Sequence, residues 1–433
     1  MKDTIRKDFF KYVSLNVLGM IGLSCYILAD TFFISKALGA TGMAALNLSI
    51  SVFSIINGVG LMLGIGGATR YSILQSQKEN KRASDVFTTS IKMGLILGIV
   101  FLLIGLFGSK DLARLLGANQ TTFLLTKTYL MTILCFAPFF IINNIIIAFV
   151  RNDHNPKLAM IAMLTGSIAN IFLDYIFMFP LDMGMFGAAF ATSLAPVIGI
   201  GVSSIHLIKG KNSLSFTGCK ITLSRLIDIV VLGLSAFINE ISSAITLITF
   251  NLVILTLEGN LGVASYGIIA NLALIGIAIF NGVAQGIQPL ISKGYGQRNV
   301  CLLKKVLKIA LITSLAIATI IYVVTFVYSD GIIHIFNNEG SIEIAKMSKI
   351  GLRIYFIGFF FAGINIIVTM YLSATERAKD AFIISIARGC VIIVPMVLLL
   401  SKIWDMTGIW MAFVLTEVMV AIYSINRQRR ITY

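Results

Sequence analysis

The chain has 433 residues, of which 58% are hydrophobic and 12% charged, and its mean hydropathy is +0.94. Soluble domains are about half apolar and about a quarter charged, so this composition excludes a soluble protein and indicates one that lies in a bilayer. The net charge of +15 does not predict a nucleic-acid partner, because the basic residues are spread over separate polar segments rather than gathered in one patch.

Twelve apolar stretches are long enough to cross a bilayer, which takes about 20 helical residues. No small-residue cleavage site follows the basic start, so no removable signal peptide is expected. We predict an all-α polytopic membrane protein with an N-lobe over 1–208, a cytoplasmic linker over 209–223 and a C-lobe over 224–433. In chain order, the predicted membrane helices are 9–35, 43–76, 86–108, 122–150, 157–180, 185–208, 224–256, 262–293, 301–328, 346–374, 379–401 and 407–426.

The two halves of the chain repeat each other. A shift of 220 residues places one set of glycines on another: Gly39, Gly42 and Gly66 fall on Gly259, Gly262 and Gly286. A shift of 221 residues places Asn144 on Asn365 and Gly187 on Gly408. A register that drifts by one residue over so long a stretch indicates a duplication. Six helices per half is an even number, so both halves enter the membrane from the same side, which predicts a parallel repeat of two pseudo-symmetric lobes.

The basic residues predict the orientation. Most of the lysines and arginines lie at the termini and in the connections after even-numbered helices. Positive residues stay on the cytoplasmic side, so both termini and the segment 209–223 are expected in the cytoplasm. The protein is expected in the cell membrane, surrounded by lipid.

Polar residues inside the first lobe predict a site. An ionisable group within a membrane span is costly and is a functional candidate by default. At 1.5 Å per residue, four predicted helices bring their polar groups to a similar depth, about 10 Å below the outer surface. These candidates are Asp30 in the first helix, Tyr129 in the fourth, Asn170 and Asp174 in the fifth, and Thr192 in the sixth.

Such a group of side chains is suited to cation exchange. Two nearby buried carboxylates cannot both ionise cheaply, so a proton can bind the pair. Alternatively, Asp30, Asn170, Asp174 and Thr192 supply hard oxygen ligands that suit Na⁺. The residue types leave H⁺ and Na⁺ both open. A purely structural reading, in which Asp30 pairs with Lys36 and Asp174 only fixes Asn170, is the competing interpretation.

In the second lobe, Glu240 lies near the middle of the seventh helix and is the candidate substrate contact. Four amides are candidates to accompany it: Asn144, Asn271, Gln285 and Asn365. Glu417 lies in the last helix without an evident partner, and we interpret Arg388 as an anchor of helix ends. Neither is assigned to the site.

Several activities are excluded by missing motifs. No G-x-x-x-x-G-K-[ST] occurs, so ATP is not expected to drive the protein directly. No H-E-x-x-H or G-x-S-x-G occurs, so a membrane-embedded enzyme, although considered, lacks a metal site or nucleophile. No cofactor is expected beyond the coupling ion.

The sequence resembles the multidrug and toxic compound extrusion (MATE) transporters over its whole length. The resemblance is carried by ADTFFISKALGATGMAAL, FVRNDHNPKLAM, NIFLDYIFMF and MGMFGAAFATS in the first half, and by ISKGYGQRN, NIIVTMYLSATERAKD and RGCVIIVP in the second. It implies a V-shaped pair of six-helix bundles that exports amphipathic, often cationic small molecules in exchange for H⁺ or Na⁺ by alternating access. We expect a monomer.

The resemblance also implies residue roles. The DinF-like branch uses a cation site that matches Asp30, Tyr129, Asn170, Asp174 and Thr192. The NorM-like branch adds a glutamate that matches Glu240 and an aspartate whose place is taken here by Asn365, which weakens a cation site in the C-lobe. The alternative within the same superfamily is a flippase for lipid-linked precursors. It is disfavoured because such a protein generally needs a basic cavity, and the candidate cavity residues here are acidic or neutral.

Overall fold

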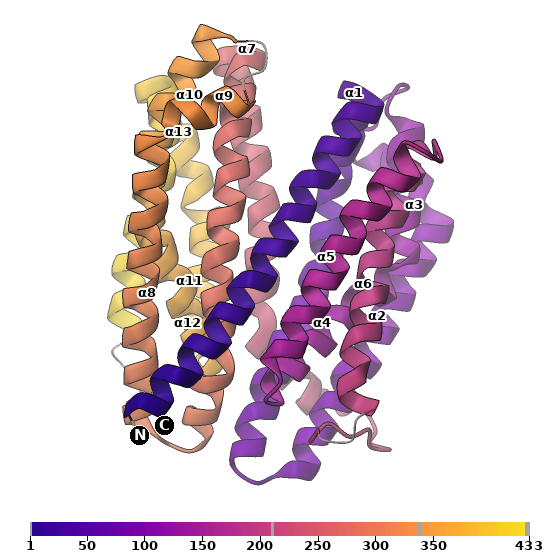
Figure 1. Ribbon diagram of the computed structural model, residues 1–433, viewed down its shortest axis with the longest axis vertical. Helices are drawn as coiled ribbons and strands as arrows, with labels where there is room; N and C mark the ends of the chain where they lie inside the picture. The colour runs from indigo at the N-terminus through magenta and orange to yellow at the C-terminus, as the bar shows by residue number, and fades with distance from the viewer. Residues whose placement is uncertain (1, 209–211, 337–339, 429–433) are drawn as a thin grey trace.

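The computed structural model describes residues 2–208, 212–336 and 340–428, which form two helical bundles (Figure 1). The first bundle contains α1 (Lys2–Ser76), α2 (Asn80–Leu115), α3 (Phe123–Cys135), α4 (Ala137–Asn152), α5 (Pro156–Met178) and α6 (Gly184–Ile208). The second contains α7 (Leu223–Gly296), α8 (Val300–Val327), α9 (Ser329–Phe336), α10 (Ile342–Tyr355), α11 (Phe359–Ala374), α12 (Ala378–Ile386) and α13 (Ile393–Gln428). A 3₁₀ turn joins α10 to α11, and a π-helical turn joins α12 to α13.

Three long helical stretches each contain two membrane spans. The α1 helix breaks at Gly39 (φ 60°, ψ −152°) and α7 breaks at Gly259 (φ 60°, ψ −149°). The third stretch, Ala378–Gln428, comprises α12, the π-helical turn and α13, and it breaks at Trp404 and Asp405. In the described ranges, nine stretches are long and apolar enough to cross a membrane when α3 and α4, bent by 49°, count as one. Dividing α1, α7 and α13 at their breaks gives the twelve spans predicted from the sequence.

The duplication is visible in the backbone. Residues with positive φ occur in pairs separated by 220 to 222 positions, which are Gly39 with Gly259, Lys78 with Arg298, His154 with Glu376, and Gly184 with Asp405. Positive φ is uncommon outside glycine, so the shared positions mark the same turns in both halves. The parallel repeat is confirmed.

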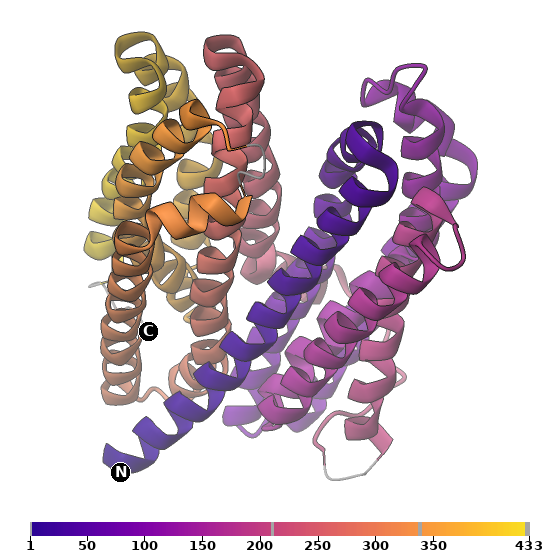
Figure 2. The ribbon, with the colours of Figure 1, turned by 45° about the horizontal axis from the view of Figure 1, so that its top comes forward.

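The two bundles meet at the end that carries the N-terminus and diverge towards the breaks in α1 and α7, which gives a V shape (Figures 1 and 2). Near the point of the V each bundle receives the beginning of the other bundle's first helix. Phe9 and Val13 of α1 pack in a cluster with Val283 and Ile287 of α7. Ile229, near the start of α7, packs in the core of the first bundle.

Glycines allow this crossed packing. A Cβ added at Gly66 would lie 2.0 Å from the carbonyl oxygen of Ile229, and one added at its repeat mate Gly286 would lie 2.8 Å from the Cα of Val13. Small residues let helix backbones approach closely within a membrane. A larger side chain at either position would force the bundles apart at the point of the V.

The helix ends depart from the sequence predictions in places. The third predicted helix, 86–108, runs as α2 over Asn80–Leu115, because nothing in its polar ends stops a helix until Gly117 takes φ 87°. The short helix α9 was not predicted. It is too short to span a membrane, so apolar length gave no signal for it.

The connection between the bundles is attached to the first bundle. Residues 212–222, which lead into α7, contain no helix and lie against the first bundle. The backbone N–H of Ser213 donates to Asp153 (2.9 Å), and the hydroxyl of Thr217 donates to Asp85 (2.7 Å). Lys92 reaches out of α2 to donate to the carbonyl of Cys219 (2.8 Å). Residues 209–211 of the predicted linker lie outside the described residues.

Candidate functional site

Two carboxylates are buried in the first bundle. Asp30 lies in the first half of α1 and Asp174 in α5, with 7% and 0% of their surface exposed. Within the described part of the chain, the Oδ1 atoms of both residues are buried and have no hydrogen-bond partner. The two side chains also lie within electrostatic range of each other. Unpaired buried carboxyl oxygens are costly, so each is suited to receive a proton or a small cation.

Asn170 connects Asp174 to α6. With its amide oriented to satisfy both neighbours, Asn170 donates to Oδ2 of Asp174 (3.0 Å) and accepts from the backbone N–H of Thr192 (3.2 Å). Asn170 and Thr192 are themselves 0% and 4% exposed. The i, i+4 spacing on α5 places Asn170 beside Asp174, as predicted, and fixes one oxygen of this carboxylate while leaving the other free.

Two tyrosines complete this group, of which the sequence identified one. Tyr129 of α3 is buried and lies within electrostatic range of Asp30 and Asp174. Tyr26 interacts electrostatically with the same two aspartates and also with Glu240 of the second bundle. Sequence reasoning missed Tyr26, although it lies four residues before Asp30 and so shares its helix face.

Glu240 of α7 reaches the first bundle. Its Oε1 accepts a hydrogen bond from Asn57 of α1 (3.0 Å), and the Oδ1 of Asn57 accepts one from Asn144 of α4 (2.8 Å). The helices approach closely here, since a Cβ added at Gly58 would lie 2.9 Å from Phe237. The structure thus brings Glu240 and Asn144 into one chain of hydrogen bonds through Asn57, which the sequence analysis did not single out.

The structure places the other candidate amides elsewhere. Asn365, which is 0% exposed, donates to Oε2 of Glu417 (2.7 Å) and accepts from Ser424 (2.9 Å). Gln285 accepts from the buried Arg151 (2.8 Å). These two side chains are not brought to Glu240. Asn271 lies half-buried in the second half of α7.

Glu417 has a partner that the sequence did not reveal. Its Oε1 accepts from the Nε of Arg388 (2.6 Å), with side-chain exposures of 2% and 15%. Arg388 lies in the π-helical turn Ala387–Val391, and such turns are frequent at functional sites. The one available signal was that the two residues carry opposite charges in neighbouring membrane helices. In the C-lobe an internal guanidinium therefore neutralises a buried carboxylate.

The oxygen groups of the first bundle fit a proton or a single small cation. Among the described residues, no three His, Cys, Asp or Glu side chains come together as a metal-binding group. Two carboxylates with an amide and a hydroxyl are a sparse set for a divalent ion, and they are chemically suited to a monovalent one.

Comparison with known proteins places this arrangement in a family. A family model described as MatE matches residues 17–176 and 235–399, more than half of the chain. The multidrug export protein MepA of Staphylococcus saprophyticus subsp. saprophyticus and that of Staphylococcus aureus (strain MRSA252) are each 28% identical over 423 residues, which is 97% of this chain and 93% of theirs.

Solved structures share the fold. An outward-facing multidrug resistance MATE family transporter of the MOP superfamily matches with a TM-score of 0.92 and 24% identity, covering 98% of this chain and 96% of that one. A Pyrococcus furiosus MOP superfamily transporter, for which a reverse polarity of the binding pocket is said to suggest a different function, matches with a TM-score of 0.91 and 24% identity, covering 98% and 95%.

The family assignment confirms the resemblance read from the sequence and the multi-pass membrane location. The chain belongs to the MatE family, and it is accordingly a membrane transporter and not an enzyme.

Proposed function

We propose that the protein exports amphipathic, often cationic small molecules by exchanging them for H⁺ or Na⁺ across the cell membrane. The observation that carries this proposal is the pair of buried carboxylates, Asp30 and Asp174, each with one unpartnered oxygen. The relatives named as multidrug export proteins support the substrate class.

The coupling cation binds in the first bundle in this proposal. A proton on Asp30 or Asp174 turns an unpaired acceptor into a donor and removes the repulsion between the two groups. Na⁺ would instead be held by oxygens of Asp30, Asn170, Asp174 and Thr192, and would compete with the bond between Asn170 and Asp174. Tyr26 and Tyr129 interact electrostatically with both aspartates, and a tyrosine hydroxyl can donate a hydrogen bond to a carboxylate that has lost its cation.

Substrate contacts Glu240, and Asn144 assists through Asn57. A cationic substrate is attracted to a carboxylate that lies where the bundles face each other. We retain Asn271 as a further candidate contact. Asn365 and Gln285 are weaker candidates, since Glu417 and Arg151 occupy their amides.

Alternating access moves the two bundles relative to each other. With the basic end of the molecule in the cytoplasm, the V opens outward in this conformation. Because a ligand shifts an equilibrium only by its different affinity for the two states, the cation must favour one of the two arrangements of the bundles, and the substrate must favour the other.

The alternative function is flipping of a lipid-linked precursor. A reversed polarity of the binding pocket is said to suggest a different function for the Pyrococcus furiosus neighbour. The sign of the charge in the binding cavity is therefore the property that separates the two functions. Here Asp30, Asp174 and Glu240 make the candidate groups acidic, which favours cationic substrates.

The test is efflux of a fluorescent organic cation from energised membrane vesicles. One run imposes only a proton gradient and the other only a sodium gradient. Efflux in at least one run supports antiport and identifies the ion. No efflux in either, with transfer of a lipid-linked pyrophosphate analogue instead, would favour the flippase.

A further inference from the structure

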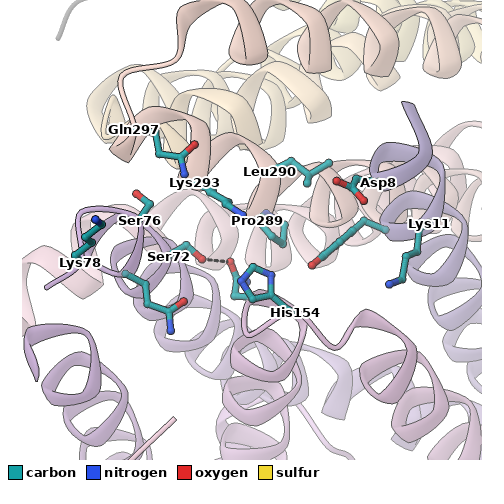
Figure 3. Close-up of a pocket in the computed structure, with 13 residues that line it drawn as sticks. Asp8, Lys11, Ser72, Ser76, Lys78, His154, Pro289, Leu290, Lys293 and Gln297 are labelled. Atoms are coloured by element: carbon teal, nitrogen blue, oxygen red, sulfur yellow. Dashed lines mark hydrogen bonds between the residues drawn. The ribbon is translucent and has the colours of Figure 1, made fainter. Parts of the chain in front are cut away.

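A cavity of about 470 Å³ lies between the bundles at the end that carries the N-terminus (Figure 3). Its walls come from both ends of α1, from the connection between α4 and α5, and from the end of α7. In Figure 3, His154 stands near the centre, with Lys78 on one side and Asp8 and Lys11 on the other. The cavity is far from Asp30 and Asp174 along the helices, and the transport proposal makes no use of it.

The charges lining this cavity are unbalanced. Lys11, Lys78 and Lys293 line it together with one carboxylate, Asp8, so with His154 neutral the lining carries a charge of +3 − 1 = +2. Within ranges 2–208, 212–336 and 340–428, none of these three ammonium groups forms an ion pair. These three ammonium groups therefore lack a carboxylate partner among the described residues.

The pKa of His154 is affected by these charges. His154 lies in the short connection between α4 and α5, and its partial burial together with the ammonium of Lys293 lowers the pKa of the imidazole. Lys11 acts in the same direction, while Asp153 and Asp8 act against it. Burial is thus the largest cause of the lowered pKa of His154, and charges of both signs reach the imidazole.

The repeat supplies a comparison within the same molecule. At the pseudo-equivalent place, Asp228 stands for Asp8, Glu376 for His154, and Arg70 for Leu290. There Arg70 pairs with Asp228 (3.3 Å) and with Glu376.

The two places therefore differ in how their charges are paired. At the pseudo-equivalent place, Glu376 lies on the turn after the fourth span of the second lobe and pairs with Arg70 of the first bundle. At the other, the same turn carries an imidazole, Leu290 stands in place of that cation, and Lys78 and Lys293 form no ion pair with any described residue. An anion from outside the chain would supply the negative charge that Lys78 and Lys293 lack at this place.

We propose that this cavity binds a phosphate group, which bridges Lys78 of the first bundle and Lys293 of the second. Lysine ammonium groups bind phosphate as point charges, and the amides of Gln75 and Gln297 in the lining add neutral donors. Since the walls come from both bundles, the bound phosphate stabilises the conformation in which the bundles meet at this end. The phosphate is that of a soluble compound or of an anionic lipid headgroup.

The experiment measures binding by the full-length protein. Inorganic pyrophosphate is titrated against the detergent-purified protein by calorimetry. In a second arm, thermal unfolding is compared in nanodiscs of pure phosphatidylcholine and of phosphatidylcholine with phosphatidylglycerol. The test variant is Lys78→Gln with Lys293→Gln. The control is Lys81→Gln with Lys304→Gln, which removes the same charge from exposed lysines outside the cavity.

Saturable pyrophosphate binding that weakens about tenfold or more in the test variant but not in the control supports a soluble ligand. A higher unfolding temperature in phosphatidylglycerol that the test variant alone loses supports a lipid headgroup. The proposal is overturned if the wild type responds to neither probe, or if both double variants lose the response equally. Because neither variant touches Asp30, Asp174 or Glu240, either result leaves the transport proposal standing or falling by its own test.

Discussion

Glu240 in α7 of the second bundle accepts a hydrogen bond from Asn57 in α1 of the first bundle at 3.0 Å. A candidate substrate contact is thereby held by the opposite bundle. If the bundles separate or rock, this bond must lengthen or break. The hydrogen bond of Glu240 therefore depends on the relative position of the two bundles. Tyr26 interacts electrostatically with Glu240 and also with Asp30 and Asp174.

Asp30→Asn and Asp174→Asn are each expected to reduce coupled efflux to the uncoupled background while leaving folding intact. An amide can still form hydrogen bonds but cannot exchange a proton or neutralise Na⁺. The measurement is vesicle efflux at matched expression. Asp182→Asn, in the exposed connection between α5 and α6, is the control and should transport normally. Wild-type rates in Asp174→Asn would refute the assignment of the cation site.

Glu240→Gln should weaken the binding of cationic compounds by about tenfold and that of neutral compounds much less, because only the cations lose a charge contact in a low-dielectric site. The glutamine can still accept a hydrogen bond from Asn57. Competition binding with a matched cationic and neutral pair of compounds measures the difference. Equal losses for both would mean that Glu240 only supports the packing of the bundles.

Arg70→Gln should shift the protein away from the conformation in which the bundles meet at the N-terminal end. It removes the ion pairs to Asp228 and Glu376 across the interface. Partly exposed pairs contribute little each, so we expect a population shift of about fivefold or less.

Spin labels at Gln77 and Cys301, both exposed near this interface, report the shift as a longer distance component. The control is Arg114→Gln, whose ion pair with Asp111 lies within one helix. An unchanged distance distribution in Arg70→Gln would show that these ion pairs do not hold the interface.

Arg388→Gln should destabilise the second bundle by about 3–5 kcal/mol, because it leaves Glu417 buried without its counter-charge. Adding Glu417→Gln to the same chain should restore most of the loss. Thermal unfolding of the purified single and double variants measures both effects. If the single variant unfolds like the wild type, the pair between Arg388 and Glu417 does not neutralise a buried charge.

The fold was largely predictable because the duplication and the lengths of the apolar stretches can both be read directly from the order of residues in the sequence. Gly39 and Gly259 were paired from the sequence, and both break a long helix with the same φ of 60°. Asn170 and Asp174 share a face because their spacing is one helical turn. The depth argument also grouped Asp30, Asp174 and Thr192, which α1, α5 and α6 bring together.

Contacts between helices were not predictable in the same way. Depth along a helix follows from residue number, but the rotation of one helix against another depends on packing. For this reason the bonds of Asn57 to Glu240 and of Arg388 to Glu417 were missed. Asn365 was a candidate to face Glu240, but it donates to one carboxylate oxygen of Glu417, whose other oxygen accepts from Arg388.

The central claim is that a cation at Asp30 and Asp174 controls the arrangement of the two bundles. The most direct measurement is the distance between spin labels at Lys36 and Thr256, exposed repeat mates near the diverging ends of α1 and α7. In the wild type this distance should change with pH or with Na⁺, and in Asp30→Asn it should respond to neither. A wild-type distance that ignores both cations would contradict the account.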